Sequence, residues 1–573
     1  MVSVENVLKS TYPKLFRYPP LISKPTVSFF KMLFHENSIN QFLSENSMTG
    51  LSFVDAVLDH LNISYKVDNR EIQNIPALGK VIITANHPLG ALDALSLLKL
   101  VSSVRQDKKV KIVANQLLSQ FAQLSELLIP VDNLSGKLSK ESLKKIEEAL
   151  QNEEAVIFFP AGEVSRANIY GVRDGKWKNG FIKFAKRTQT PVLPVYIDAK
   201  NSTLFYTASM LYKPLGGMLL SHEMFTARNS VFEFRIGELI ASQTITDMRL
   251  TYKQHAKLFR RHLYRIARNK KGIYATEQCI AHPESRQQIK HELQSAERIG
   301  TTSDNKHIYL CDHDAAPTLL NEIGRLREYS FRKVGEGTGS HKDTDRFDAY
   351  YQHLVLWDDD ALEVVGAYRI GECNWILSWL GHDGLYLNQL CDIKEGFEHY
   401  LNDAIELGRS FVQPRYWGTR ALDYLWQGIG AYLSHNPQIK YMTGPVSLSG
   451  TYPKDAKDAL IYFYGTYFGT DEKLLEPKAS YRLSQFTKDE MEVLFVGDNY
   501  QEDFRRLKEY LRAFNVTVPT LYKQYSELCD DEGVKFLDFG VDAEFNDCID
   551  GFILVDVRKI KATKRKRYML ETV

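Results

Sequence analysis

The fold of the N-terminal half is decided at residues 81–93, which read VIITANHPLGALD. The first four residues form a short apolar run of the kind that makes a buried strand. A helical segment follows near residues 91–100, and the Pro-Leu-Gly tripeptide between the two favours a turn. Residues 81–100 therefore predict a strand, a turn and a helix.

Within this stretch His87 and Asp93 are six residues apart, nearly two turns of a helix. Side chains at that spacing in one helix do not touch, so their contact requires a turn at residues 88–90 and a helix whose first turn contains Asp93. With that contact, His87 accepts a proton from a hydroxyl that attacks a carbonyl. Asp93 then fixes the imidazole tautomer and stabilises its developing charge. The spacing alone favours a structural role for the pair.

Strands and helices alternate beyond this stretch. Residues 139–151 predict an amphipathic helix capped by Ser139, and apolar runs at 155–159, 191–197 and 231–236 predict strands. From residue 306 a second series follows, with strands at 306–310, 353–357, 364–369 and 404–412 and helices at 319–332 and 421–433. We expect an α/β protein of two domains, residues 1–270 and 306–573, joined by a polar helical linker at 271–305.

Bulk composition excludes several classes of protein. The 72 Lys and Arg residues balance 71 Asp and Glu residues, which gives no case for a nucleic-acid partner. None of the six cysteines lies before residue 279 and none forms a closely spaced pair, so neither a disulfide framework nor a metal site is expected. The chain lacks a secretory signal at its start, and no apolar run reaches the ~20 residues that span a bilayer. We expect a cytoplasmic protein without a cofactor.

Two segments suggest contact with a surface. Residues 26–34, TVSFFKMLF, are short, apolar and aromatic; they form either an N-terminal helix packed on the domain or an interfacial segment that dips into lipid. Seven basic residues lie between Arg558 and Arg567. They form either a solvated end or a contact with anionic headgroups or an acidic protein. The sequence leaves both alternatives open for each segment.

Residues 80–200 carry four blocks in a fixed order. The blocks are Asn86-His87 with Asp93, Leu128-Ile129-Pro130-Val131, Phe159-Pro160-Ala161-Gly162-Glu163-Val164-Ser165-Arg166, and Val192-Leu193-Pro194-Val195. This order resembles the glycerolipid acyltransferase family typified by 1-acylglycerol-3-phosphate acyltransferase. The resemblance implies that His87 is the base and Asp93 its orienting partner. It also implies that Gly162, Glu163 and Arg166 lie along the acceptor site.

Two departures from the common family pattern point to one of its branches. Five residues separate the His from the Asp where four are usual, and Ala161 stands where a glutamate is usual. Both departures, with Asp174, Trp177 and Gly180 after them, resemble the branch that acylates lyso-ornithine lipid and related lyso-aminolipids. Arg166 is suited to the carboxylate of such an acceptor and equally to a phosphate, so it does not discriminate between them; alternatively, it forms a surface salt bridge.

The second half has no His-Asp block, and its most informative stretch is residues 406–418, ELGRSFVQPRYWG. A strand that runs into a turn and then a helix at residue 421 directs backbone N–H groups and arginines toward a thioester. The same stretch is equally an ordinary strand-turn-helix with surface arginines. Several blocks of this half carry a family resemblance: Arg325-Leu326-Arg327-Glu328, Gly335-Glu336-Gly337-Thr338-Gly339, Asp345, Asp348, His353-Leu354, Val365-Gly366-Ala367-Tyr368-Arg369 and Glu406-Leu407-Gly408-Arg409-Ser410. They resemble the ornithine N-acyltransferases of the GNAT fold. That group is akin to the acyl-homoserine-lactone synthases.

That resemblance implies direct attack of an amine on a thioester. Glu406 is a candidate to accept the amine proton, with Arg409 as a charge stabiliser. Glu328, Asp345 and Asp348 compete as carboxylates that bind a cationic amino acid. Residues 415–421 are poor in glycine, whereas acetyl-CoA enzymes of the wider fold carry a glycine-rich pyrophosphate loop there. This difference argues for acyl carrier protein as the donor.

Together the two halves resemble the bifunctional ornithine-lipid synthases. The resemblance implies that the second half joins a 3-hydroxyacyl group to the α-amine of ornithine. The first half then esterifies the hydroxyl of this lyso-lipid, as a peripheral enzyme at the inner face of the bacterial inner membrane. Glycine, lysine or glutamine is an alternative acceptor. Two other interpretations are a lysophospholipid acyltransferase with an accessory GNAT-like module, and a non-enzymatic haemolysin-like protein.

Overall fold

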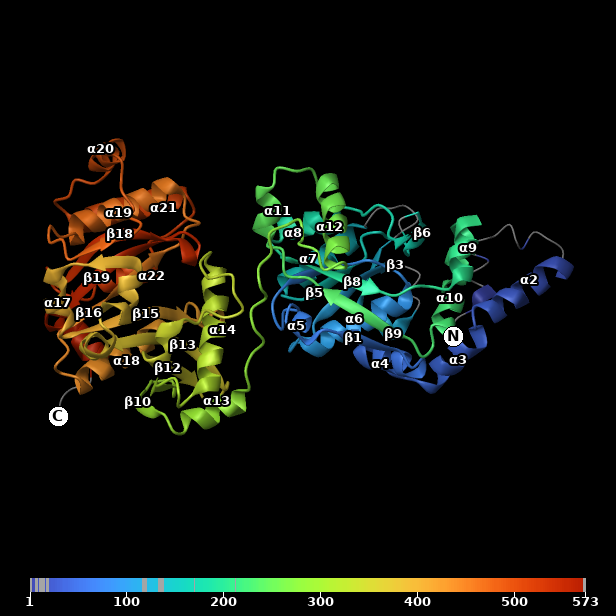
Figure 1. Cartoon of the computed structure of the whole chain (residues 1–573), viewed down its shortest axis with the longest axis horizontal. Coiled ribbons are helices and arrows are strands. Elements are labelled where there is room, and N and C mark those ends of the chain that lie inside the picture. Colours follow the sequence, from blue (N-terminus) through green and yellow to red (C-terminus); the bar gives the residue numbers. More distant parts are fainter. Residues whose placement is uncertain are drawn as a thin grey trace. The chain divides into compact units, whose positions relative to one another are not determined.

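The structure is a computed structural model of the 573-residue chain. It describes residues 3–5, 9, 16, 20–115, 121–131, 139–169, 171–211 and 213–569. The chain forms two compact units, Met1–His282 and Pro283–Val573 (Figure 1).

A seven-stranded sheet organises the described part of the first unit. Its strand order is β1-β9-β8-β2-β5-β3-β4, and every neighbouring pair is parallel except β8 and β9. The strands are β1 (Ser64–Val67), β2 (Val81–Ala85), β3 (Val110–Asn115), β4 (Leu128–Val131), β5 (Ala155–Phe158), β8 (Val192–Asp198) and β9 (Val231–Ile236), with a separate hairpin of β6 (Arg166–Asn168) and β7 (Gly171–Arg173).

Helices cover both faces of this sheet. The central strand β2 is buried at all five positions, as expected for a strand that has helices on both sides. Apolar residues of α4 and α6 form a cluster on one face, and those of α7, α8 and α12 form a cluster on the other. The helices are α2 (Pro20–Leu33), α3 (Glu36–Glu45), α4 (Gly50–His60), α5 (Asn69–Ile72), α6 (Ala91–Val104), α7 (Lys140–Gln151), α8 (Gly180–Arg187), α9 (Thr203–Leu211), α10 (Lys213–Thr226), α11 (Ser242–Asp247) and α12 (Tyr252–Ile266).

The second unit is built on an eight-stranded sheet of order β10-β11-β12-β13-β15-β16-β19-β18. The described pairs are antiparallel except β15 with β16. Its strands are β10 (Glu297–Thr301), β11 (His307–Cys311), β12 (Gln352–Asp358), β13 (Glu363–Glu372), β15 (Ala404–Val412), β16 (Tyr441–Leu448), β18 (Val534–Asp542) and β19 (Cys548–Asp556), and β14 (Cys391–Ile393) pairs with β17 (Leu475–Pro477).

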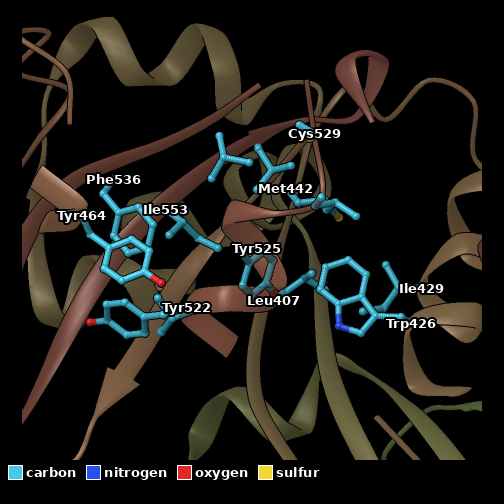
Figure 2. Close-up of a cluster of buried hydrophobic side chains, with 14 of the residues drawn as sticks. Leu407, Trp426, Ile429, Met442, Tyr464, Tyr522, Tyr525, Cys529, Phe536 and Ile553 are labelled. Atoms are coloured by element: carbon cyan, nitrogen blue, oxygen red, sulfur yellow. The ribbon is translucent and has the colours of Figure 1, made fainter. Parts of the chain in front are cut away.

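Different helices cover the two faces of the second sheet. One face carries a large cluster rich in aromatic side chains, and Figure 2 shows Trp426, Tyr464, Tyr522 and Phe536 within it. Two smaller clusters cover the opposite face, one with α13 and α14 and the other with α15, α16 and α17. The helices are α13 (Arg286–Leu293), α14 (Pro317–Lys333), α15 (Cys373–Leu380), α16 (Tyr386–Leu390), α17 (Glu395–Leu401), α18 (Ala421–His435), α19 (Lys454–Phe468), α20 (Gln485–Leu494), α21 (Tyr500–Ala513), α22 (Thr520–Ser526) and α23 (Ala562–Tyr568).

The structure adds detail to three expectations from the sequence. The segment 271–305, expected to be a linker, contributes α13 and β10 to the second unit from Pro283 onward. Residues 26–33 lie within α2, and the basic end of the chain includes α23, where Arg567 pairs with Asp423 at 2.8 Å. None of the described helices is long and apolar enough to cross a bilayer.

Candidate active sites

The first site lies at the carboxyl ends of β2 and β5, which are adjacent parallel strands. His87 follows β2, and residues 159–162 follow β5, so both loops reach the same edge of the sheet. Asn86 fixes the end of β2, because its side chain exchanges hydrogen bonds of 2.7 and 2.9 Å with the backbone of Ile197 in β8. The His87 ring stacks on Phe159 with ring centroids 4.1 Å apart.

His87 and Asp93 meet as the sequence predicts. Gly90, with φ of 96°, turns the chain, and Asp93 lies in the first turn of α6. Asp93 Oδ2 accepts the backbone N–H groups of Leu89 at 2.8 Å and Gly90 at 3.3 Å, while Oδ1 lies 3.1 Å from His87 Nδ1. Burial lowers the pKa of His87, but the Asp93 carboxylate outweighs burial and raises the net pKa above the usual 6.5. The pair is therefore arranged for general-base catalysis.

Asp174 holds the loop that carries His87. Its Oδ1 accepts the backbone N–H of His87 at 3.2 Å and the hydroxyl of Ser165 at 2.5 Å, and its Oδ2 accepts the indole N–H of Trp177 at 2.8 Å. The backbone N–H of Ser165 in turn donates to the carbonyl of His87 at 2.7 Å. Asp174 thus links the His87 loop to the block that follows β5. The sequence marks this residue only as part of a family resemblance.

A cavity of about 2120 Å³ opens at His87. Its wall includes the backbone turn of Gly162, which has a φ of 68°, and the neighbouring Glu163. Apolar residues line another part of the wall: Ala94, Ile112, Phe121, Val131, Leu143 and Phe158. The cavity exceeds the ~300–1,000 Å³ of an ordinary small-molecule site, and its apolar wall suits a long acyl chain.

Arg166 lies next to the cavity rather than on its described wall. The guanidinium donates to the hydroxyl of Ser209, and its Nε lies 3.5 Å from Glu163 Oε2. The predicted acceptor-site residues therefore divide into two groups. Gly162 and Glu163 face the cavity, whereas Arg166 is held beside Glu163.

The second site begins where two central strands of the second sheet separate. Strands β15 and β16 pair only from Ala404 to Glu406 on one side and from Tyr441 to Thr443 on the other. At Gly444, a Cβ atom would lie 2.1 Å from the carbonyl oxygen of Leu407, so only glycine fits where the strands diverge. Beyond this point no pairing between the two strands is described. The backbone N–H and C=O groups on their facing edges are therefore available to a thioester and its amide-containing arm.

Glu406 is the last residue of β15 that pairs with β16. Its buried carboxylate accepts the Tyr351 hydroxyl at 2.5 Å and the backbone N–H groups of Tyr386 at 3.1 Å and Leu387 at 2.7 Å. Burial raises the pKa of Glu406. The same contacts anchor the start of α16, so Glu406 has a structural task whatever its role in proton transfer.

The other carboxylates predicted for the second site are already engaged. Arg327 donates to Asp348 at 2.7 Å, and Arg369 donates to Asp345 at 2.5 Å and to Asp348 at 3.2 Å. Arg409, with φ of +48°, lies 3.5 Å from Asp345. Burial raises the pKa of Asp348, but its two arginine partners outweigh burial and hold that pKa well below its usual range.

Glu328 is engaged as well. Its carboxylate accepts Arg332 Nε at 2.6 Å, the backbone N–H and hydroxyl of Thr338 at 3.0 and 2.9 Å, and the backbone N–H of Gly339 at 2.9 Å. These bonds fasten the glycine-rich loop 335–339 to α14. Glu328 therefore holds the wall of the site.

Sequence reasoning missed a second group of acids in this unit. Ligand atoms of Asp542, Cys548 and Asp550 lie within 4.8 Å of one another. Glu336 accepts the hydroxyl of Ser447, the residue that pairs with Asp550 across β16 and β19. Burial raises the pKa of Asp550 to about 8 and that of Glu336 to about 7. The one sequence signal is the aspartate at position 550 inside a strand that is otherwise almost entirely apolar.

Comparison with known proteins identifies the two units. Residues 6–272 match the family described as Acyltransferase, and residues 326–427 match the Acetyltransferase (GNAT) domain. A Lyso-glycine lipid O-acyltransferase of Bacteroides thetaiotaomicron is 33% identical over 273 residues, which are 46% of this chain and 97% of that protein. The chain belongs to the acyltransferases.

Two further relatives are N-acyltransferases. The Glycine N(alpha)-acyltransferase of Bacteroides thetaiotaomicron is 32% identical over 303 residues, which are 51% of this acyltransferase and 89% of the relative. The L-ornithine N(alpha)-acyltransferase of Brucella abortus is 28% identical over 167 residues, which are 26% of this acyltransferase and 57% of the relative. The expected fold class, a glycerolipid-acyltransferase-like half and a GNAT-like half, is confirmed.

Proposed function

We propose that this acyltransferase makes a phosphorus-free aminolipid in two steps. The second unit transfers a 3-hydroxyacyl group from acyl carrier protein to the α-amine of an amino acid. The first unit then esterifies the 3-hydroxyl of that lyso-lipid. The observation that carries this proposal is the presence of two separate acyl-transfer arrangements in one chain, at His87 and at the separation of β15 from β16.

In the first unit His87 is the proposed base. It takes the proton of the lipid hydroxyl as the hydroxyl oxygen attacks the thioester carbonyl, and Asp93 stabilises the imidazolium that forms. The carbon–sulfur bond then breaks, and the proton passes from His87 to the leaving thiolate. Gly162 and Glu163 lie on the wall of the same cavity, which supports their placement along the acceptor, with Arg166 orienting Glu163.

In the second unit Glu406 is the proposed acceptor of the amine proton as the amine attacks the thioester carbonyl, and Arg409 is the proposed stabiliser of the carbonyl oxygen. The carbon–sulfur bond then breaks, and the leaving thiolate of the carrier takes up the proton. We assign binding of the ammonium form to Glu336, Asp542 and Asp550, because none of these three acids forms an ion pair with a described residue. Glu328, Asp345 and Asp348, by contrast, are already occupied by arginines and backbone donors. We therefore assign Glu328, Asp345 and Asp348 to holding the walls of the site rather than to binding the amino acid.

The amino acid is ornithine by resemblance, with glycine as the second candidate. Ornithine carries two amines, and the second site contains three acids without an ion pair among the described residues, namely Glu336, Asp542 and Asp550. These acids suit ornithine. The glycine N-acyltransferase relative, in contrast, is covered over 89% of its length, which keeps glycine as the alternative.

The proposed location is the inner face of the bacterial inner membrane. Large apolar side chains are exposed on α2 and α9 and on the β6–β7 hairpin, among them Phe29, Met32, Leu204, Leu211 and Ile169. Exposed apolar groups of this kind suit insertion into the boundary between headgroups and acyl chains. They support peripheral attachment near the lipid-accepting cavity.

Lipid analysis of a host that lacks aminolipids tests the proposal. Expression of the chain is expected to produce a phosphorus-free, ninhydrin-positive lipid with one amide-linked and one ester-linked chain, and fragmentation in mass spectrometry identifies the head group. Altered phospholipid chains without a new lipid would support a lysophospholipid acyltransferase instead. Cell lysis without any new lipid would support a haemolysin-like protein.

A further inference from the structure

Lysines that form no ion pair among the described residues gather at one end of the cavity that contains His87. We name them the basic face: Lys176, Lys178, Lys183, Lys186, Lys253 and Lys257, all on the cavity wall. Two of them, Lys183 and Lys186, lie 5.8 Å from the centre of the Tyr252 ring. Five of them are exposed and Lys186 is half-buried. None forms an ion pair with a carboxylate of the described residues, and Glu163 is the single acid among the described residues of that wall. The local charge is strongly positive in a chain whose net charge is only +1.

Two packed helices hold most of this face in place. The helices α8, GFIKFAKR, and α12, YKQHAKLFRRHLYRI, contain no acidic residue. They pack through Phe181 and Phe259, whose ring centroids are 5.2 Å apart in an edge-to-face contact. Lysines three or four positions apart on a helix repel one another, so the arrangement is unfavourable for the free protein. A bound anion removes that penalty.

The two ends of the cavity differ in chemistry. Away from the basic face, its wall includes Ile39 of α3 and Leu220 and Met224 of α10. Figure 1 shows α2, α3, α9 and α10 at one end of the first unit and α8, α11 and α12 at the other. The apolar end suits entry of the lipid acceptor. The basic end is then left for the acyl donor, and His87 lies on the wall of the same cavity.

The basic surface also extends beyond the cavity along α12. Arg261 and Arg265 are exposed and follow Lys253 and Lys257 at intervals of four residues. The row from Lys253 to Arg265 spans about 18 Å at ~1.5 Å per residue. A row of this length exceeds what the clustered phosphates of one nucleotide need, and it suits the acidic surface of a folded protein. Tyr252 is the one large apolar residue exposed among the described residues of α8 and α12, whereas bilayer insertion needs several.

We propose that the basic face docks an acidic carrier protein, which delivers its acyl thioester to His87 on a phosphopantetheine arm. This inference rests on the proposed O-acyl transfer in the first unit. Docking places the arm at the basic end of the cavity, with the acyl chain against the apolar wall. The basic face then favours a donor with an extended acidic surface over a donor that presents only the clustered phosphates of one nucleotide.

A charge-reversal experiment on the full chain tests this docking. The variant Lys183→Glu with Lys257→Glu changes two exposed residues, and Lys66→Glu with Lys109→Glu reverses two exposed lysines elsewhere on the same unit. Fluorescence anisotropy measures the Kd for labelled acyl carrier protein. We expect the Kd to rise about tenfold or more for the first variant only, and the wild-type Kd to rise with salt. Equal Kd values for the two variants would overturn the proposal.

Transfer assays in uncharged detergent separate docking from chemistry. With acyl carrier protein as donor, the basic-face variant is expected to show a raised KM and a kcat within about twofold of wild type. With acyl-pantetheine, which has no carrier, both variants are expected to match wild type. Loss of activity with acyl-pantetheine, or loss of binding to anionic vesicles with an unchanged KM for the carrier, would reject docking. Carrier binding that depends on the basic face without any ester product would reject only the proposed function.

Discussion

Asp174 accepts a hydrogen bond of 3.2 Å from the backbone N–H of His87, although the two residues are 87 positions apart in the chain. The same oxygen accepts the hydroxyl of Ser165, whose own N–H donates to the His87 carbonyl. The backbone N–H and carbonyl of His87 are thus both bonded to the segment after β5. Asp174 touches no reacting atom in the proposed mechanism, so it is a positioning residue for His87.

Asp174→Ala is expected to lower kcat for ester formation by about 10- to 100-fold with little change in the KM for the lyso-lipid. The reason is that the variant frees the backbone of the His87 loop, whereas Asp174 itself does not lie on the described cavity wall. Asp174→Asn keeps an oxygen that accepts from His87 and Ser165, so it should recover part of the lost kcat. Steady-state kinetics of all three proteins test this. A rise in KM with unchanged kcat would contradict the positioning role.

His87→Ala is expected to abolish ester formation and to let the mono-acylated lyso-lipid accumulate. The second unit carries its own site, and no step there uses His87. Quantitative mass spectrometry of lipid extracts measures both species. Persistence of the diacylated lipid at wild-type levels would remove His87 from the mechanism.

Arg409→Ala is expected to remove both lipids, since the second unit makes the substrate of the first. Arg409 lies 3.4 Å from Asp343 and over the rings of Tyr386 and Phe545. Its loss therefore also removes the ion-pair partner of a buried carboxylate, at a cost of up to about 3–5 kcal/mol, although Arg327 and Arg369 still act on the Asp343 charge. Arg409→Lys keeps the charge and serves as the second variant. Supply of synthetic lyso-lipid should restore the diacylated product in both. Normal lyso-lipid levels without that supply would count against the second site.

Local patterns in the sequence predict much of the fold, and they allow the contact between His87 and Asp93. The strand at residues 404–412 and the start of the helix at 421 are confirmed, since both depend on short-range periodicity. The contact of His87 with Asp93 is also local, because a glycine turn and one helical turn bring the two together. The β10 strand is missed because it is short, half-exposed and polar at the edge of its sheet.

Tertiary neighbours decide what the sequence does not show. Nothing near position 174 predicts a bond to His87, since the two segments meet only through the order of the sheet. The acids at 336, 542 and 550 converge because β16, β18 and β19 are adjacent and α14 ends beside them. The predicted carboxylates Asp345 and Asp348 are paired with arginines from two other elements. Chain spacing carries no information about such pairings.

Ester formation is expected to fall at acid pH with a midpoint above 6.5. His87 must be neutral to accept a proton, and its pKa is raised because the Asp93 carboxylate outweighs burial, which lowers it. Activity is therefore lost as pH falls through the His87 pKa. Asp93→Asn removes the charge, so the acid limb should move to lower pH while kcat decreases. Measurement of kcat/KM from pH 5 to 9 tests this. An acid midpoint that does not move in the variant would show that Asp93 does not set the pKa of His87.

The second unit is expected to lose stability as pH rises from about 4 to about 8, because of Asp550. Burial first, and then the nearby Asp542 and Glu336 charges, raise the folded-state pKa of Asp550 to about 8, against the opposing effect of Arg409 and a hydrogen bond from Cys548. The folded protein therefore binds a proton across this range that the unfolded chain, with a pKa near 3.9, has already released. The stabilising contribution is complete below the unfolded pKa and is lost as pH rises.

Asp550→Asn removes this titration and should raise Tm at pH 9 relative to wild type, with little difference at pH 4. Four pKa units correspond to about 5 kcal/mol at most, and relaxation around a buried charge reduces the expected gain at pH 9 to about 2 kcal/mol. Thermal unfolding of the full chain between pH 4 and pH 9 measures the change. Asp531→Asn, at an exposed position, is the matched control and should follow wild type throughout. A Tm difference between Asp550→Asn and wild type that does not vary with pH would show that Asp550 is charged in the folded protein over the whole range.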